Sequence, residues 1–181
     1  LRNRMAVVVF GTTAGNWSDN TKWVGGAKPA TGDTASFAAT SAACTFDANQ
    51  TVAAVDFTGY TNTFTHNAFS LIVAGSVTFV AGMTYTPLET ATLTTSATGT
   101  LTTGGLLMPN VSITGGNFTV GDNLSFMASK LISLKLGGTA FDMNGKTING
   151  NSATNRIHIK ATTVGTAKTI TNATTSFINA D

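Results

Sequence analysis

The chain has 181 residues, of which 42% are hydrophobic and only 10% are charged, and its formal net charge is +2. This much apolar material, including 11 phenylalanines, excludes a disordered chain and leaves disorder at most for the ends. Scattered basic residues without interleaved aromatic ones lack the footprint of a nucleic-acid binder, and no apolar run approaches the ~20 residues that cross a bilayer.

The first predicted element is a strand over Met5–Phe10. It follows two arginines and so has the outline of a signal peptide, but it is shorter than the ~7–15 apolar residues of such a peptide, and Gly11 follows at once. Met5 followed by Ala6 reads as a natural start. We therefore interpret Leu1–Arg4 as an upstream extension or a processed end.

Residues 1–50 differ in composition from the rest, and we expect them to be an irregular segment that caps or anchors the fold. Both tryptophans lie here, at Trp17 and Trp23. Buried indoles would cap the fold or anchor the chain on a neighbour, whereas exposed indoles would stack on sugar rings. The sequence favours a cap or anchor over a sugar platform.

Residues 51–181 are rich in threonine, and we predict that they form a β-solenoid. The chain holds 35 threonines, and among them short apolar pairs recur with one residue between their members, which is the periodicity of a strand. The pairs return about every 22 residues, in two series. The first series is Val55, Val77, Leu101, Leu124, Ile148 and Ile170, and the second is Leu71, Leu93, Ile113, Leu134, Ile157 and Phe177.

A fixed period of this length favours a parallel β-helix with three short strands per coil, and about five to six coils between Val55 and Phe177. Turns such as Asn144-Gly145 would equally suit antiparallel hairpins, so an all-β sandwich is the alternative. The strands of a sandwich, however, have no reason to repeat in register. Helical signals are poor, and the best candidate, Phe126–Leu136, still alternates like a strand.

Several segments, taken in their order along the chain, carry a resemblance to one group of viral proteins. The leading segments are Gly15-Asn16-Trp17-Ser18, Trp23-Val24-Gly25-Gly26, Pro29, Gly32-Asp33 and Phe37. The later ones are Val55-Asp56-Phe57-Thr58-Gly59-Tyr60, Gly75-Ser76-Val77-Thr78-Phe79, Leu101-Thr102-Thr103-Gly104, Met108-Pro109-Asn110-Val111-Ser112-Ile113 and Phe141-Asp142-Met143-Asn144-Gly145-Lys146-Thr147-Ile148. The chain thereby resembles the Thr-rich β-solenoid structural proteins of tailed bacteriophages and viral metagenomes.

The resemblance implies a fibre, spike or capsid-decorating protein that is often oligomeric. Two features depart from the group. Val8-Val9-Phe10 stands where such a leader usually has a strand with its own tryptophan, and related chains are often longer.

Paired carboxylates would be the mark of an enzyme, since many phage β-helices cleave polysaccharides. Glycoside hydrolysis requires two carboxyl groups about 5–5.5 Å or about 6.5–9.5 Å apart. Asp33 and Asp56 are 23 residues apart and Asp122 and Asp142 are 20 apart, so either pair can lie on neighbouring coils. Asp33 and Asp122 each follow a glycine, where short polar residues serve turns, so a structural role is favoured for both pairs.

The remaining chemistry-bearing residues form no coherent site. His66 and His158 are far apart and lack ligand spacing, which argues against zinc. Cys44 is the only cysteine, so no intrachain disulfide forms and a buried structural thiol is expected. Neither a Gly-x-Ser-x-Gly elbow nor a phosphate loop is present. We therefore assign no catalytic, cofactor-binding or metal-binding residue.

The function expected from the sequence is that of a non-enzymatic structural protein of a virion, located on the surface of the particle. An uncapped solenoid exposes a strand edge, and Phe177–Asp181 keep the character of the repeat. We therefore expect another chain to cover the last coil, in a homo-oligomer that also contacts other virion proteins. A carbohydrate-binding adhesin that meets a host-surface glycan is the alternative, and a polysaccharide depolymerase is a more distant one.

Overall fold

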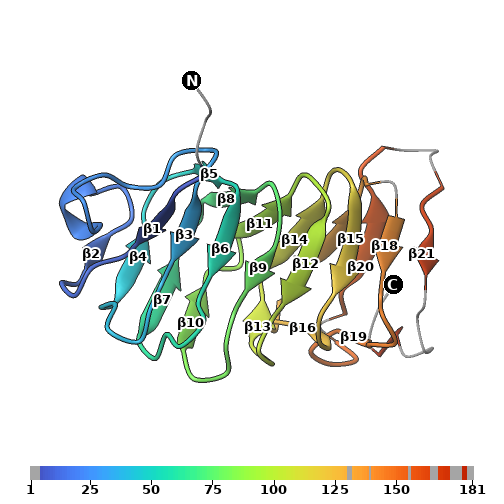
Figure 1. Ribbon diagram of the computed structural model, residues 1–181. Helices are drawn as coiled ribbons and strands as arrows, with labels where there is room; N and C mark the ends of the chain where they lie inside the picture. Colours follow the sequence, from blue (N-terminus) through green and yellow to red (C-terminus); the bar gives the residue numbers. More distant parts are fainter. Residues whose placement is uncertain are drawn as a thin grey trace.

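The computed structural model describes residues 5–129, 132–138, 140–154, 156–163, 167–171 and 177–178. They form an elongated stack of coils in which the paired strands of every sheet run parallel (Figure 1). The predicted parallel β-solenoid is therefore confirmed. The sandwich alternative is wrong, because its hairpins would pair strands antiparallel.

Each coil has three faces, and strands of successive coils stack on each face. The first face is one eight-stranded sheet, formed by β1 (Val7–Val9), β3 (Thr34–Ser36), β6 (Ala54–Asp56), β9 (Val77–Thr78), β12 (Gly99–Thr102), β15 (Asn117–Val120), β18 (Ala140–Asp142) and β21 (Ile170–Thr171). The second face is two four-stranded sheets, the first formed by β2 (Gly15–Asn16), β4 (Cys44–Phe46), β7 (Thr63–His66) and β10 (Thr84–Pro87), the other by β13 (Leu107–Met108), β16 (Leu124–Phe126), β19 (Ile148–Asn149) and β22 (Phe177–Ile178). The third face is a six-stranded sheet, formed by β5 (Gln50–Val52), β8 (Ser70–Val73), β11 (Thr92–Thr95), β14 (Asn110–Ile113), β17 (Ser133–Leu136) and β20 (His158–Ala161).

The chain visits the three faces in the same order in every complete coil. In the described part of the chain six complete coils result, from β3–β5 to β18–β20, preceded by β1 and β2 and followed by β21 and β22. In the first coil the short 3-10 helix η1 (Asn20–Lys22) follows β2 where the later coils continue into a third-face strand. Eight stacked strands on the first face make a rod about 34 Å long, at ~4.8 Å per strand spacing.

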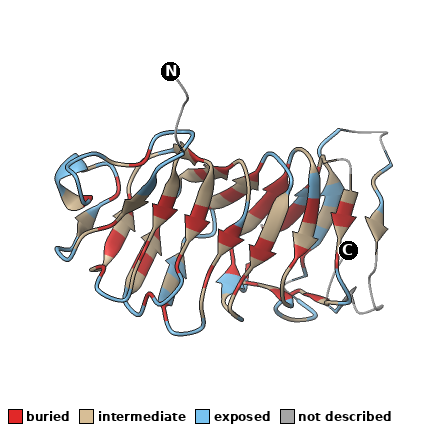
Figure 2. Cartoon of the chain, viewed as in Figure 1, coloured by how far each residue is buried: buried red, intermediate tan, exposed pale blue. Residues whose placement is uncertain are grey.

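More buried and less buried residues alternate along most strands, as the strand period requires (Figure 2). Inside, the rings of Phe37, Phe57 and Phe79 form a continuous stack, with centroids 4.6 and 5.2 Å apart. Outside, Thr65 and Thr86 are register partners on the second face, and the Thr86 hydroxyl donates to the Thr65 hydroxyl at 3.2 Å. Aliphatic and aromatic residues therefore fill the core, and threonine lies on the surface.

The parallel sheets continue across residue 50, where the composition changes. Strands β1 and β2 of the first coil already pair with β3 and β4 of the second. The irregular part of the N-terminal region is thus the segment between β2 and β3. Short strands interrupted by long turns conceal the repeat there.

The N-terminal end of the rod is closed by an antiparallel contact. Phe10 and Trp23 form an antiparallel bridge, Gly11 N–H donates to the Lys22 carbonyl at 2.7 Å, and Val24 N–H donates to the Val9 carbonyl at 2.9 Å. The segment Lys22–Val24 therefore satisfies backbone groups that the edge strand β1 would otherwise expose. We call this segment, Lys22–Val24, the strap. Because it runs antiparallel to β1, another coil cannot add to it in the parallel register of the stack.

The helix candidate at Phe126–Leu136 contains no helix where it is described: Phe126 ends β16, Ser133–Leu136 form β17, and the described residues between them belong to no helix or strand. Lys130 and Leu131 lie outside the described residues. Within the described chain, η1 is the one helical element, and no helix is long and apolar enough to cross a membrane.

Candidate functional site

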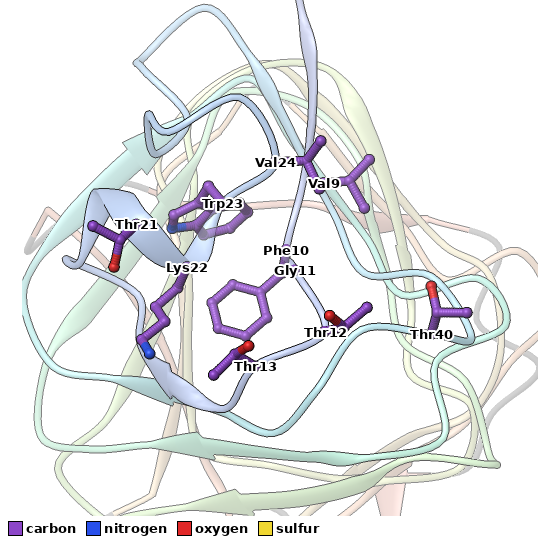
Figure 3. A pocket seen from close by; sticks show the side chains of 10 residues that line it. All are labelled: Val9, Phe10, Gly11, Thr12, Thr13, Thr21, Lys22, Trp23, Val24 and Thr40. Atoms are coloured by element: carbon purple, nitrogen blue, oxygen red, sulfur yellow. The ribbon is translucent and has the colours of Figure 1, made fainter.

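A cavity of about 290 Å³ opens at the N-terminal end of the rod (Figure 3). It is lined by the first coil and one turn of the second, namely by Val9, Phe10, Gly11, Thr12, Thr13, Thr21, Lys22, Trp23, Val24 and Thr40. Its polar groups are threonine hydroxyls and one lysine. Among the described residues, the lining holds no carboxylate, histidine or cysteine, the side chains that most often serve as a general base at neutral pH.

Trp23 lines this cavity and packs against Trp17 in an aromatic cluster. Trp17 is 0% exposed and Trp23 is 2% exposed, and their ring centroids are 4.9 Å apart in an edge-to-face arrangement. The Trp23 Nε1–H donates to the Trp17 carbonyl at 2.8 Å, which fixes both residues. A sugar platform at these indoles is wrong for this structure, because neither presents a ring face to solvent. Both tryptophans instead complete the core under the first coil.

The first carboxylate pair is separated along the strand direction. Asp33 precedes β3 and accepts hydrogen bonds from the backbone N–H groups of Ala6 and Ala30 at 3.0 and 2.9 Å. Asp56 ends β6 and accepts from the backbone and hydroxyl of Thr58 at 2.9 and 2.6 Å. Ser36 is the register partner of Asp56, and Asp33 precedes Ser36 by three residues. The backbone of Asp33 is therefore displaced from that of Asp56 by about 10 Å along the strand direction. Each carboxylate holds its own turn.

The second pair repeats this arrangement on later coils. Asp122 accepts from the backbone N–H groups of Thr103 and Gly104 at 2.8 and 2.7 Å, which ties one corner to the coil before it. Asp142 pairs in register with Thr119, three residues before Asp122, and accepts from the Asn144 N–H at 2.8 Å. The expectation that turns use these aspartates agrees with their hydrogen bonds.

Two further aspartates serve the first coil. Asp19 caps η1 and accepts from the Thr21 hydroxyl and backbone, and these two hydrogen bonds lower the pKa of its exposed carboxyl. Asp47 accepts from both the backbone and the hydroxyl of Ser18. The turns of the second coil and the η1 segment are thereby joined through side chains.

His66 is completely buried between the second and third faces. A carbonyl can only accept, so Nε2–H donates to the Phe69 carbonyl at 3.0 Å, and the Tyr85 hydroxyl donates to Nδ1 at 2.8 Å. Burial lowers the pKa of His66 to about 4. The ring is therefore a neutral structural bridge between coils. His158 is exposed on β20, far along the rod, so the structure does not bring the two histidines together.

Cys44 confirms the expected buried thiol. It is 1% exposed in β4, and burial, with a smaller contribution from Asp47, raises its pKa far above the usual value. No group of three or more His, Cys, Asp or Glu side chains that could hold a metal ion occurs in the described parts of the chain.

The structure also brings together residues that the sequence did not connect. Lys135 of β17 and Lys160 of β20 are 25 residues apart, yet they are register partners on the third face, and both are exposed. His158 precedes Lys160 by two residues and points outward beside it. Only the coil register could have revealed this contact, because nothing in the local sequence marks it.

No protein-family model, curated protein or solved structure matches this chain.

Proposed function

We propose that this chain is a non-enzymatic structural protein of a tailed-phage particle, part of a fibre, a spike or a capsid decoration. The observation that carries the proposal is where the chemistry-bearing side chains lie. The aspartates weighed as catalytic pairs hold turns, the tryptophans fill the core, and His66 bridges two coils. The polar residues of a rod built in this way serve its rigidity.

Exposed apolar side chains at the N-terminal end support the same proposal, because they suit self-association or anchoring. Large hydrophobic side chains are exposed there, with Met5 at 77%, Val7 at 68% and Val24 at 65%. Val7 lies on β1, and Val24 belongs to the strap that closes this end. We take these exposed apolar side chains, which lie at one end of the rod, as part of a surface that another protein covers. A partner in the particle, either a second copy or another virion protein, fits it.

The experiment is to locate the protein in purified particles from a culture that produces it. Particles are banded on a density gradient, their proteins are identified by mass spectrometry, and an antibody against the chain is imaged by electron microscopy. We expect the chain to co-purify with the particles at a fixed stoichiometry, with label on an appendage or on the capsid surface. Recovery of the chain only in the soluble fraction would contradict the proposal.

A carbohydrate-binding adhesin is a second candidate because of one specific observation. The third face carries paired exposed cations, Lys135 and Lys160, instead of the tryptophans that the sequence suggested. A polysaccharide depolymerase finds no comparable support, since neither aspartate pair lies in register.

A further inference from the structure

We propose that the third face of the last two complete coils binds an acidic polysaccharide, through Lys135, His158 and Lys160. This inference is independent of the assignment to a phage particle. It starts from the contact between Lys135 and Lys160, which are opposite each other in neighbouring parallel strands about 4.8 Å apart.

Like charges placed directly opposite each other in a sheet are destabilising. Both lysines are exposed, and in the described part of the chain neither amine has a hydrogen bond or an ion pair to offset the repulsion. The strands of this sheet contain no Asp or Glu: their sequences are QTV, SLIV, TLTT, NVSI, SLKL and HIKA. An anionic ligand would supply the missing counter-charge.

Protection of a sheet edge does not explain both lysines. Lysines on edge strands prevent unwanted pairing with other chains, and Lys160 on the last strand of the sheet suits that role. Lys135, however, lies on β17, which pairs with β14 on one side and with β20 on the other. A lysine inside the sheet protects no edge, so the pair has another use.

The shape and composition of the face favour a polysaccharide over a nucleic acid. Apart from Ile72 and the single imidazole of His158, the outward side chains of these strands are short and polar or cationic, and none is Phe, Tyr or Trp, so the face offers no row of rings on which successive nucleobases stack. Thr92 and Thr94 of β11 present hydroxyls on the same face, about 10 Å from β17 across two strand spacings. Cations beside neutral hydroxyls match the carboxylates and hydroxyls of a uronic-acid polymer.

Other basic residues extend the cationic region toward the C-terminal end of the rod. Arg156 is exposed two residues before His158, in line with the outward residues of β20. The Lys168 amine lies at the corner after β17, within 3.2 Å of the Gly137 carbonyl. Binding to such a region is electrostatic in part and is therefore weakened by salt.

The experiment measures binding of sodium polygalacturonate oligosaccharides to the full chain by isothermal titration calorimetry, with dextran and single-stranded DNA as comparison ligands. We expect polygalacturonate to bind, dextran to bind weakly if at all, and DNA to bind more weakly than polygalacturonate. Replacing both lysines in a Lys135→Gln/Lys160→Gln variant should weaken polygalacturonate binding by about tenfold or more, which corresponds to ~1.4 kcal/mol.

Two control variants make the result specific. Lys135→Arg/Lys160→Arg keeps the charge and should keep the affinity. Lys22→Gln/Lys28→Gln makes the same change in net charge at the other end of the rod and should leave binding unchanged. Equal weakening by both glutamine variants, tighter binding of DNA, or no binding of polygalacturonate would each overturn the proposal. Thermal unfolding separates a folding failure from a binding loss, because removal of like-charge repulsion should leave the melting temperature of Lys135→Gln/Lys160→Gln unchanged or raised.

Discussion

Aspartate occupies the corners of this rod because its carboxylate accepts backbone N–H groups that turn away from the ladder. Asp56 and Asp19 each bind the backbone and hydroxyl of a threonine two residues later, and Asp142 binds the backbone of Asn144 in the same way. Asp122 reaches the coil before it. A hydrogen bond from a backbone N–H to a carboxylate is charge-assisted and therefore stronger than one to a neutral acceptor, although solvent weakens it at the surface.

The single thiol should be inert in the folded protein. Cys44 is buried and burial raises its pKa, so the thiolate that reacts with electrophiles is scarce and inaccessible. We expect no labelling by iodoacetamide in native buffer over an hour and complete labelling in 6 M guanidinium, measured by mass spectrometry. Stoichiometric labelling of the native protein would show that β4 is not packed as described.

His66 should make stability depend on pH. Its folded pKa of about 4 lies below the ordinary value of 6.5, so on acidification the unfolded chain binds this proton first. The contribution of neutral His66 to the free energy of unfolding is complete above pH 6.5. It is lost as the pH falls toward 4, by about 1.4 kcal/mol for each pH unit. We expect guanidinium unfolding at pH 7, 6, 5 and 4.5 to show this decline.

The matched variants for His66 separate it from other titrating groups. A His66→Phe/Tyr85→Phe double variant removes the buried histidine and its hydroxyl partner together, and the decline between pH 6.5 and 4.5 should become much shallower. His158→Gln changes the exposed histidine and should leave the decline intact. An unchanged pH profile in the double variant would refute the assignment to His66.

At the scale of the element, coils close through glycines that approach the backbone of the preceding coil. Gly116 has φ +63° and Gly105 has φ +77°, so both adopt the left-handed conformation that glycine tolerates best. They differ in their surroundings. A Cβ at Gly116 would overlap the backbone of Ala97 and Thr98, whereas a Cβ at Gly105 would meet nothing within 4 Å.

This difference predicts that the same substitution, glycine to alanine, lowers the free energy of unfolding by unequal amounts at the two positions. Gly105→Ala should lower the free energy of unfolding by about 1–2 kcal/mol, from backbone strain alone. Gly116→Ala adds the overlap with the coil below, at about 1–3 kcal/mol more. Chemical denaturation of the two variants side by side tests the stacking distance, and equal losses would contradict it.

The strand period predicted the type of element but not the face on which each strand lies. Val55, Val77 and Leu101 of the first apolar series are stacked on the first face, as the period implies. The next two members, Leu124 and Ile148, stack on each other on the second face instead. Apolar pairs on all three faces look alike in sequence, and coil lengths vary, so a series drifts from one face to another.

The candidate sites were predictable to different degrees, because the sequence shows local signals but not which residues of neighbouring coils lie side by side. A glycine before Asp33 or Asp122 is a local signal, and the turn roles that it suggested agree with their hydrogen bonds. Whether an indole is buried depends on neighbouring coils, so Trp17 and Trp23 could only be weighed between two roles. The contact between Lys135 and Lys160 depends entirely on register, which composition does not encode.

At the scale of the whole molecule, the rod is a stack with one continuous core, which runs from the aromatic cluster of the first coil to Phe141, Ile148 and Ile157 near the C-terminal end of the stack. Aromatic residues concentrate near the N-terminal end, where Trp17, Trp23 and Phe37 pack together. Farther along, Leu101 and Val120 are register partners in the interior. This stacking places every outward residue beside its equivalents in neighbouring coils, which is what creates both the threonine rows and the cationic region.

The central claim is the parallel register of the coils, and cysteine cross-linking tests it most directly. In a Cys44→Ala background, Thr65→Cys/Thr86→Cys replaces register partners whose Cα atoms are about 4.8 Å apart, within the range of a disulfide. Thr63→Cys/Thr86→Cys replaces residues on the same two strands that are offset by two positions, about 8 Å apart. After mild oxidation and peptide mapping, the account predicts an intramolecular disulfide in the first variant and none in the second. Efficient cross-linking of the offset pair, or none of the register pair, would contradict it.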